Sequence, residues 1–232
     1  MSTEAGFKVY QDITRPAPSI IEQYKDFVVA NVSDSLGSLF TMHHSVKPVY
    51  HGMRALCGPA FTVRARPGDN LLSLKAIELA QPGDVIVIAT DGDETRSVWG
   101  GFMSMMSARK GLAGMVTDGI VRDVAQTRDE NFAVFARGVT PVAPSKNSSG
   151  QINTTVSCAG VVVQPGDLVL GDEDGVVVVP KQEIENVIAQ VHARIERESA
   201  WEKLVEGGEL IPMDAIDAFL QEHAAELLGR KD

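Results

Sequence analysis

Residues 114–123 read GMVTDGIVRD, a short apolar run that ends in a glycine-marked turn and is followed at once by an arginine and an aspartate. An apolar run of this length between turn signals is typical of a buried strand. Glycine permits the positive φ that such a turn can need, which makes Gly119 a candidate for that conformation. We expect the turn to deliver the guanidinium of Arg122 and the carboxylate of Asp123, side by side, to the mouth of a sheet.

A second glycine-rich stretch, Gly100-Gly101-Phe102-Met103, opens a segment of helical character. The start of a helix offers backbone N–H groups without intrahelical partners, and these bind anions. Together with Arg122 and Asp123, it predicts a site for a small carboxylate and a divalent cation. An adjacent Arg-Asp pair in a loop is more often a surface ion pair of little energetic value, so the residues alone leave both interpretations open.

Outward from this region, short apolar runs alternate with segments of helical periodicity. The pattern predicts helices over residues 18–38, 69–81 and about 100–110, a half-buried strand over 61–66, and strands over 85–89, 114–117 and 132–136. Residues 85–89 have no polar face, which is typical of a strand covered on both sides. This alternation of strands and helices predicts an α/β fold.

The sequence pattern changes between Thr154 and Pro180. Three β-branched runs are separated by Pro-Gly-Asp and Asp-Glu-Asp-Gly turns, a pattern that predicts an antiparallel β unit. Helical patterns follow from Ile184 and from Asp214. We therefore expect an N-terminal extension over residues 1–17, an α/β domain over 18–205 and a C-terminal helix over 206–232.

Composition excludes several functional classes. The chain has 232 residues, a net charge of −10, 44% hydrophobic residues and 22% charged residues, which argues against extensive disorder and against a nucleic-acid partner. No stretch approaches the roughly 18–20 consecutive apolar residues that span a bilayer. The first six residues lack a signal-peptide pattern, and cytoplasmic localisation is the expectation.

Five blocks of the chain resemble the RraA-like family, which includes 4-hydroxy-4-methyl-2-oxoglutarate / 4-carboxy-4-hydroxy-2-oxoadipate aldolases and regulators of ribonuclease E activity. The resembling blocks are residues 32–36, 67–71, 82–87, 100–123 and 165–180, in the family's order. The resemblance implies a swivelling β/β/α domain with a C-terminal helical extension. It also implies a homotrimer or a dimer of trimers whose cleft lies between neighbouring subunits.

The resemblance also implies roles for the residues of the two stretches. In the aldolases, the start of the helix holds the substrate carboxylate, which assigns substrate binding to Gly100, Gly101, Phe102 and Met103. The roles of Arg122 and Asp123 follow likewise: both are catalytic, Arg122 binds the substrate, and Asp123 is the metal ligand. Asp123 is a hard oxygen ligand suited to Mg²⁺ or Mn²⁺. A planar guanidinium donates two hydrogen bonds to one group in a geometry that lysine does not reproduce.

Two positions depart from the family's pattern. Many of the aldolases carry an acidic residue three positions after the metal-binding aspartate, where this chain has Gln126. An amide neither acts as a base nor supplies negative charge. Gly101 stands where aldolase members often have glutamate; its backbone N–H remains, but any role of a side chain is lost. Gln126 and Glu198 are candidates to contact the water molecules around the metal, Glu198 by approach from a neighbouring subunit.

Three functions follow from these residues. The first is a metal-dependent aldolase or lyase that cleaves a 4-hydroxy-2-oxo polycarboxylic acid to pyruvate, or decarboxylates oxaloacetate through the same enolate. The second is a non-catalytic regulator that binds a ribonuclease or another protein. The third is a Schiff-base aldolase that uses Lys75, Lys110 or Lys146, which requires a lysine with a depressed pKa.

Overall fold

The computed structural model describes residues 6–222, which divide into two compact units, the first ending at Val191 and the second beginning at His192. Of the expected terminal segments, residues 1–5 and 223–232 lie outside the described residues. Within the described part, no helix has both the length and the apolar content that crossing a membrane requires.

The first unit is built on a mixed sheet. Among the described residues, nine strands form it, in the order β1-β9-β3-β4-β5-β7-β2, with β12 and β13 joined through β3. These strands are β1 (Phe7–Val9), β2 (Lys47–Pro48), β3 (Leu56–Arg64), β4 (Val85–Ala89), β5 (Gly114–Thr117), β7 (Val134–Ala136), β9 (Gly150–Ile152), β12 (Leu168–Asp172) and β13 (Gly175–Val179). The central neighbours β3, β4, β5 and β7 run parallel, as βαβ crossovers require. The predicted α/β fold is confirmed.

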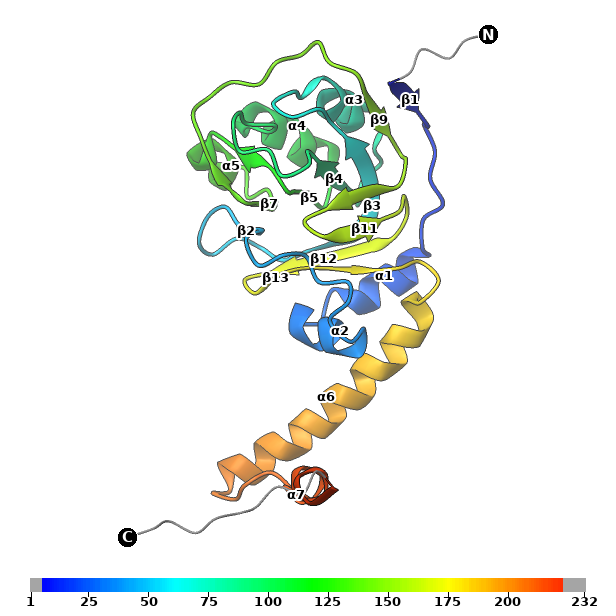
Figure 1. Cartoon of the computed structure of the whole chain (residues 1–232), viewed down its shortest axis with the longest axis vertical. Helices are drawn as coiled ribbons and strands as arrows, with labels where there is room; N and C mark the ends of the chain where they lie inside the picture. Colours follow the sequence, from blue (N-terminus) through cyan, green and yellow to red (C-terminus); the bar gives the residue numbers. More distant parts are fainter. Residues whose placement is uncertain (1–5, 223–232) are drawn as a thin grey trace. The chain divides into compact units, whose positions relative to one another are not determined.

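Three helices connect these parallel strands and lie together on one side of the sheet (Figure 1). They are α3 (Leu71–Leu79), α4 (Gly101–Lys110) and α5 (Val124–Asp129). The other side is covered by β12 and β13 and by a second hairpin, β10 (Val156–Cys158) with β11 (Val161–Val163). Two hydrophobic cores result, one on each face of the sheet.

Strand β4 shows why the sequence pattern of residues 85–89 has no polar face. Val85 and Val87 belong to the core beneath the hairpins, whereas Ile86 and Ile88 belong to the core beneath the helices. Because successive side chains of a strand point to opposite faces, covering both faces requires an apolar residue at every position. All five residues of β4 are buried, as predicted.

The expectation of a half-buried strand over residues 61–66 was wrong in its extent and burial. Strand β3 starts at Leu56 and ends at Arg64, and its residues from Gly58 to Val63 are buried. It lies in the centre of the sheet between β4 on one side and β9 and β12 on the other. Thr62, which suggested a polar face, is buried and donates a hydrogen bond from its Oγ1 to the carbonyl of Thr154 at 2.6 Å.

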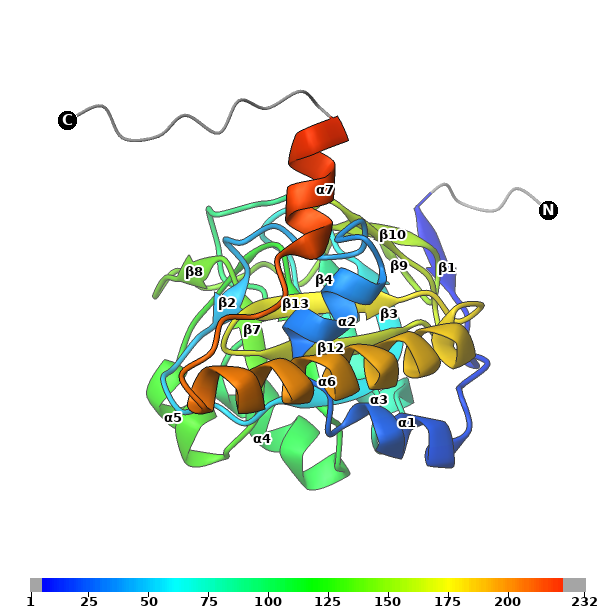
Figure 2. The ribbon, with the colours of Figure 1, turned by 90° about the horizontal axis from the view of Figure 1, so that it is seen from below.

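The segment predicted to be helical over residues 18–38 forms two short helices, α1 (Pro18–Tyr24) and α2 (Val29–Ser35). Val28 is extended, and the N–H of Val29 donates to the carboxylate of Asp172 at 2.9 Å, so the hairpin turn starts the second helix. Helix α2 packs against β12 and β13 (Figure 2). The local periodicity could not reveal this partner 143 residues away.

Four further elements complete the described chain. They are the short parallel pair β6 (Ile120–Val121) and β8 (Gly138–Val139), and the helices α6 (Ile184–Glu206) and α7 (Asp214–Glu222). Ile184, Val187 and Val191 of α6 are buried in the first unit. Helix α7 belongs to the second unit and has no buried residue.

Candidate active site

The carboxyl-terminal ends of β4 and β5 are joined by a buried aspartate. Asp118 follows β5, and its Oδ1 accepts hydrogen bonds from the N–H of Thr90 at 2.7 Å and from the Oγ1 of Thr90 at 3.0 Å. Its Oδ2 accepts the N–H of Gly92 at 3.2 Å. Asp118 therefore holds the loops after two neighbouring parallel strands together, at the edge where ligands bind in open α/β sheets.

The glycine of this turn has a different role from the one expected. Gly119 does not adopt a positive φ. A Cβ at this position would lie 2.8 Å from the Oγ1 of Thr90, so the glycine allows a close approach between the two loops instead. The chain then passes through β6 and reaches Arg122 and Asp123.

Asp123 is held in an uncommon backbone conformation. Its φ of 57° and ψ of 43° place it in the left-handed region, where it forms the residue before α5. Aspartate is among the few non-glycine residues that visit this region, and such conformations cluster at functional sites. The N–H of Arg122 donates to the carbonyl of Trp99 at 3.0 Å, which attaches this turn to the segment before α4.

The structure brings Asp123, Arg122 and the start of α4 together. The Oδ2 of Asp123 lies 3.4 Å from the Nε of Arg122 and accepts the N–H of Gly101 at 3.2 Å. Both side chains remain accessible, 38% exposed for Arg122 and 43% for Asp123. A Cβ on Gly100 would lie 2.7 Å from the same Oδ2, so this close approach depends on the absence of a side chain at Gly100.

The other two residues of the helix start differ in their exposure. Phe102 is 62% exposed, whereas Met103 is buried. The first N–H groups of α4 have no carbonyl partner within the helix, because no helical turn precedes them. The N–H groups of Phe102 and Met103 have no acceptor within the described residues, so they are free to donate to an anion.

A buried hydrogen-bond network fixes α4 against α5. The indole N–H of Trp99 donates to the Oγ of Ser104 at 2.9 Å, and this hydroxyl lies 3.0 Å from the Oγ1 of Thr127. The N–H of Ser104 also donates to the carbonyl of Gly100 at 3.0 Å. Sequence analysis did not identify these supporting residues, because their spacing matches no motif.

Asn70 adds a polar group to the region. The residue is buried, its Nδ2 lies 3.4 Å from the sulfur of Met103, and its Oδ1 has no hydrogen-bond partner among the described residues. Buried polar atoms are nearly always paired, so an unpaired one next to the start of α4 indicates a place for a ligand or an ordered water.

The neighbouring Asp69 organises the loop over residues 145–148. Its Oδ2 accepts hydrogen bonds from the Oγ of Ser145 and from the N–H groups of Asn147 and Ser148, and its Oδ1 accepts the N–H of Leu71. Burial acts to raise the pKa of Asp69, but these hydrogen bonds outweigh it, so the pKa lies below its usual value. The carboxylate is therefore a fixed structural anion, and it lies one residue before Asn70, the N-cap of α3.

We predict that Asp69→Asn lowers the free energy of unfolding by about 1–3 kcal/mol at neutral pH, because the amide leaves donors of the loop unpaired. A lowered pKa contributes stability that is present above the unfolded-state value of about 3.9 and is lost as the pH falls through the folded-state value. The difference between wild type and variant, measured by urea unfolding, is therefore expected to be largest at pH 7 and to shrink below pH 4. Asp129→Asn, at an exposed position, serves as the control. A difference independent of pH would contradict the prediction.

Gln126 and Glu198, the two candidates to contact the water molecules of the metal, lie in different units. Gln126 is on the first turn of α5, and its side-chain carbonyl faces Gly101: a Cβ on Gly101 would lie 2.2 Å from the Oε1 of Gln126. Glu198 belongs to the second unit, where its carboxylate lies 3.6 Å from the Nη1 of Arg194. An approach of Glu198 to the site of a neighbouring copy stays a prediction.

Two of the three lysines considered for a Schiff base are engaged elsewhere. The Nζ of Lys75 pairs with Glu78 at 2.6 Å. Lys110 lies at the end of α4 opposite to Gly101, and its Nζ donates to the carbonyls of Ile77 and Glu78. Lys146 follows Ser145 in the loop that Asp69 holds. The Schiff-base hypothesis gains no structural support.

The donor set around Asp123 fits one kind of metal ion. Within residues 6–222, no three His, Cys, Asp or Glu side chains form a cluster able to hold a metal. A closed protein cage is therefore absent from this part of the chain. Mg²⁺ is commonly bound through one or two carboxylates, while water and substrate fill the remaining positions. The accessible carboxylate of Asp123 suits such an ion.

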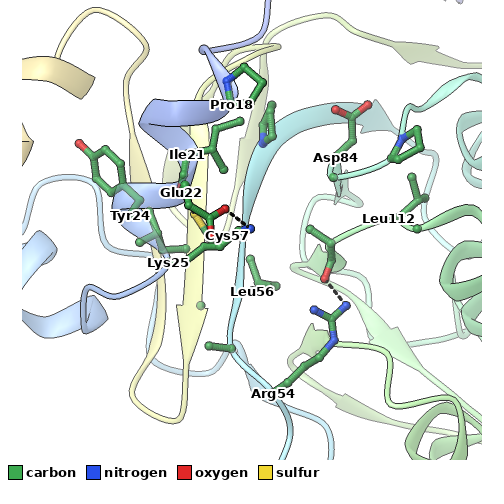
Figure 3. Close-up of a pocket in the computed structure, with 18 of the residues that line it drawn as sticks. Pro18, Ile21, Glu22, Tyr24, Lys25, Arg54, Leu56, Cys57, Asp84 and Leu112 are labelled. Atoms are coloured by element: carbon green, nitrogen blue, oxygen red, sulfur yellow. Dashed lines mark hydrogen bonds and ion pairs between the residues drawn. The ribbon is translucent and has the colours of Figure 1, made fainter.

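A cavity of about 1030 Å³ lies at the opposite edge of the sheet, at the amino-terminal ends of β4 and β5 (Figure 3). Its walls include Ile21 of α1, Leu56 and Cys57 of β3, and Leu112 before β5. Burial raises the pKa of the Cys57 thiol to about 12, so this cysteine is not a reactive thiolate. The cavity contains none of the predicted site residues, and the convergence of polar groups at Asp123 makes that edge the stronger candidate.

Comparison with known proteins agrees with the fold and the sequence pattern. The family model described as "RraA-like: Aldolase/RraA" matches residues 29–178. A protein of Halalkalibacterium halodurans, named provisionally as a 4-hydroxy-4-methyl-2-oxoglutarate aldolase, is 39% identical over 201 residues, covering 87% of this chain and 93% of that protein.

Two solved structures share the fold. An uncharacterised protein from Pseudomonas syringae has a TM-score of 0.76 and 27% identity, with coverage of 85% of this chain and 96% of that chain. Streptomyces coelicolor RraAS2, described as an unusual member of the RNase ES inhibitor RraA family, has a TM-score of 0.72 and 27% identity, with coverage of 84% and 99%. The predicted RraA-like fold with a C-terminal helical extension is thus confirmed. With a family model that spans most of its first unit and a relative that matches nearly end to end, this chain belongs to the RraA-like family.

Proposed function

We propose that the protein is a divalent-metal-dependent lyase that cleaves a 4-hydroxy-2-oxo polycarboxylic acid to pyruvate. One observation carries the proposal: the carboxylate of Asp123 and the guanidinium of Arg122 lie at the start of α4, where the N–H groups of Phe102 and Met103 are free. The similarity to the Halalkalibacterium protein supports the choice of substrate class.

The reaction requires the stabilisation of negative charge on one fragment. The C4 hydroxyl loses its proton, the C3–C4 bond breaks, and its electron pair forms the enolate of pyruvate, which then takes a proton at C3. Decarboxylation of oxaloacetate breaks the corresponding bond, releases CO₂ and forms the same enolate. An active site speeds both reactions by placing positive charge and hydrogen-bond donors where the enolate oxygen develops.

Each residue of the candidate site has a task in this scheme. The N–H groups of Phe102 and Met103 hold the substrate carboxylate at the start of α4, where the helix dipole favours an anion. Arg122 donates its guanidinium N–H groups to the oxygens of the 2-oxo acid. Asp123 would hold Mg²⁺ or Mn²⁺, which supplies Lewis-acid stabilisation of the developing negative charge when bound.

Because residue 126 is a glutamine, α5 supplies no proton acceptor next to Asp123. Its amide cannot accept the proton of the C4 hydroxyl, and no carboxylate of α5 lies within one turn of Asp123. The proton therefore leaves through a water molecule in this scheme. A carboxylate of a neighbouring copy, with Glu198 as the candidate, would orient that water in a homotrimer or a dimer of trimers.

The test measures pyruvate release from 4-hydroxy-4-methyl-2-oxoglutarate and from oxaloacetate, with Mg²⁺ and after treatment with EDTA. We expect release from at least one substrate, its loss in EDTA, and its recovery on adding Mg²⁺ or Mn²⁺. Borohydride with substrate should leave the enzyme active, since no lysine forms a covalent imine. Turnover that survives EDTA would contradict the proposal.

Gln126 also favours a second candidate function. Loss of the acidic residue and occupation of the space over Gly101 by an amide suit a protein that has kept the fold without the chemistry. Such a protein would act as a regulator that binds a ribonuclease or another protein, consistent with its similarity to Streptomyces coelicolor RraAS2, a member of the RNase ES inhibitor RraA family. Absence of pyruvate release from either substrate, together with inhibition of a ribonuclease, would favour this function.

A further inference from the structure

The cavity at the amino-terminal ends of β4 and β5, about 1030 Å³ in volume, is lined by residues of the first unit alone. Apolar side chains form its walls: Ile21 of α1, Leu56 of β3 and Leu112 before β5 lie around it (Figure 3). Leu170 of β12 also lines it. Small-molecule sites are clefts of about 300–1,000 Å³ lined mainly by apolar side chains. The cavity therefore has the size and the lining of a site for an organic molecule.

The carboxylates that line this cavity are engaged within the chain. Each of the four has a partner among the described residues: Asp84 pairs with Arg15, Glu22 with Lys25 and Glu130 with Arg109, and Asp172 accepts the N–H groups of Val29 and Asp174. The pair between Asp84 and Arg15 is bidentate, with distances of 2.8 Å and 2.7 Å. The acidic residues therefore do not form an open site for a cationic ligand.

Of the three cations that line the cavity, Arg54 has no carboxylate partner among the described residues. Its Nε donates to the carbonyl of Asn131 at 3.0 Å, and its Nη2 donates to the carbonyl of Ala113 at 2.8 Å. Figure 3 shows Arg54 extending from the segment before β3 toward the residues before β5. The two carbonyl oxygens fix the guanidinium without cancelling its charge. A guanidinium held in this way is preorganised to donate to a carboxylate.

We propose that the cavity binds an organic monocarboxylate with an aliphatic chain. The carboxylate of this ligand pairs with the Nη1 and Nη2 of Arg54, which supply charged hydrogen-bond donors. The chain replaces water against Ile21, Leu56 and Leu112, where the burial of apolar surface is favourable. The uncompensated charge of Arg54 is the feature that selects an anion over a neutral or cationic molecule of the same size.

The proposed ligand site is separate from the candidate active site. Ala108 and Gly111, at the end of α4, line the cavity, whereas Gly101 at the start of the same helix contacts Asp123. Neither Arg122 nor Asp123 lines the cavity. The inference therefore does not depend on the proposed lyase activity.

The first test is isothermal titration calorimetry of the full chain with octanoate and with decanoate. We expect a single site per chain and about tenfold tighter binding of decanoate, because each buried methylene adds to the affinity. Octan-1-ol, which has the same chain length as octanoate but no charge, should bind more weakly by about tenfold. Absence of saturable binding of decanoate below about 1 mM would overturn the proposal, as would equal affinities for octanoate and octan-1-ol.

The second test compares two substitutions that remove the same charge. Arg54→Gln should weaken the binding of decanoate by about tenfold, because the carboxylate loses its charged donor. Arg66→Gln is the matched control, since Arg66 is exposed and follows the end of β3, at the edge of the sheet opposite to Arg54. Circular dichroism shows whether each variant remains folded. Equal affinities of wild type and Arg54→Gln, or equal losses in the two variants, would contradict the role of Arg54.

Protection of Cys57 locates the ligand in the unaltered chain. Cys57 lines the cavity, whereas Cys158 is buried and does not line it. Saturating decanoate should slow the alkylation of Cys57 by iodoacetamide at alkaline pH by about tenfold, measured by mass spectrometry of the peptide that contains Cys57. An unchanged rate at saturating decanoate would show that the ligand binds elsewhere and would overturn the proposal.

Discussion

Asp123→Asn is expected to lower kcat/KM for pyruvate release by about 10³-fold while leaving the free energy of unfolding nearly unchanged. The substitution removes the negative charge proposed to hold the cation. It keeps an oxygen that accepts the N–H of Gly101, the contact that Asp123 makes at 3.2 Å. Asparagine also tolerates the left-handed backbone conformation of this position.

The comparison with Asp123→Ala separates the effect of the Asp123 charge on activity from the effect of its hydrogen bond and backbone conformation on stability. Alanine lacks both the charge and the hydrogen bond, and it is less tolerant of a φ of 57°, so this variant should lose activity and stability together. Steady-state kinetics at several Mg²⁺ concentrations and urea unfolding provide the two measurements. Equal activity of wild type and Asp123→Asn would remove Asp123 from the mechanism.

Gly100→Ala is expected to lower kcat/KM by about 10²-fold, because a displacement of reacting groups by about 1 Å can have this effect. The new Cβ would lie 2.7 Å from the Oδ2 of Asp123 and 3.3 Å from the Cγ of Arg122. Both side chains are partly exposed and can move away, so the change should appear in catalysis more than in folding. Gly100 has an extended backbone conformation, so alanine introduces no backbone strain there.

Gly138→Ala is the matched control for this substitution. Its Cβ would meet the nearest neighbouring atom, a methyl group of Ile120, at an ordinary 3.7 Å. Kinetics and thermal unfolding of both variants should show a loss of activity in Gly100→Ala alone. Wild-type kinetics in Gly100→Ala would show that the geometry between α4 and Asp123 does not matter for turnover.

The sequence alone determined those helices, strands and turns whose residues follow a local pattern. The unbroken apolar run of β4, the helix of α4 and the turn between β12 and β13 follow from local patterns, because burial on one or two faces imposes a period on neighbouring residues. The same holds for the association of Arg122 and Asp123 with residues 100–103. A turn after a strand and the start of a helix lie at one edge of such a sheet, and the resemblance to a family with these motifs pointed to the same residues.

Only the tertiary structure decided the features that depend on contacts between distant segments. Thr62 is buried because β9 and β12 complete the sheet around β3, and residues 18–38 form two helices because Asp172 binds the N–H of Val29. Position 119 needs a glycine because a Cβ there would lie too close to Thr90. Asp118 joins the loops after β4 and β5, and nothing in the sequences of these loops indicates that they meet. In each case the deciding partner lies far along the chain, and no local periodicity encodes its position. The sequence therefore specified which residues form the elements, and packing between those elements specified the conformation of the site.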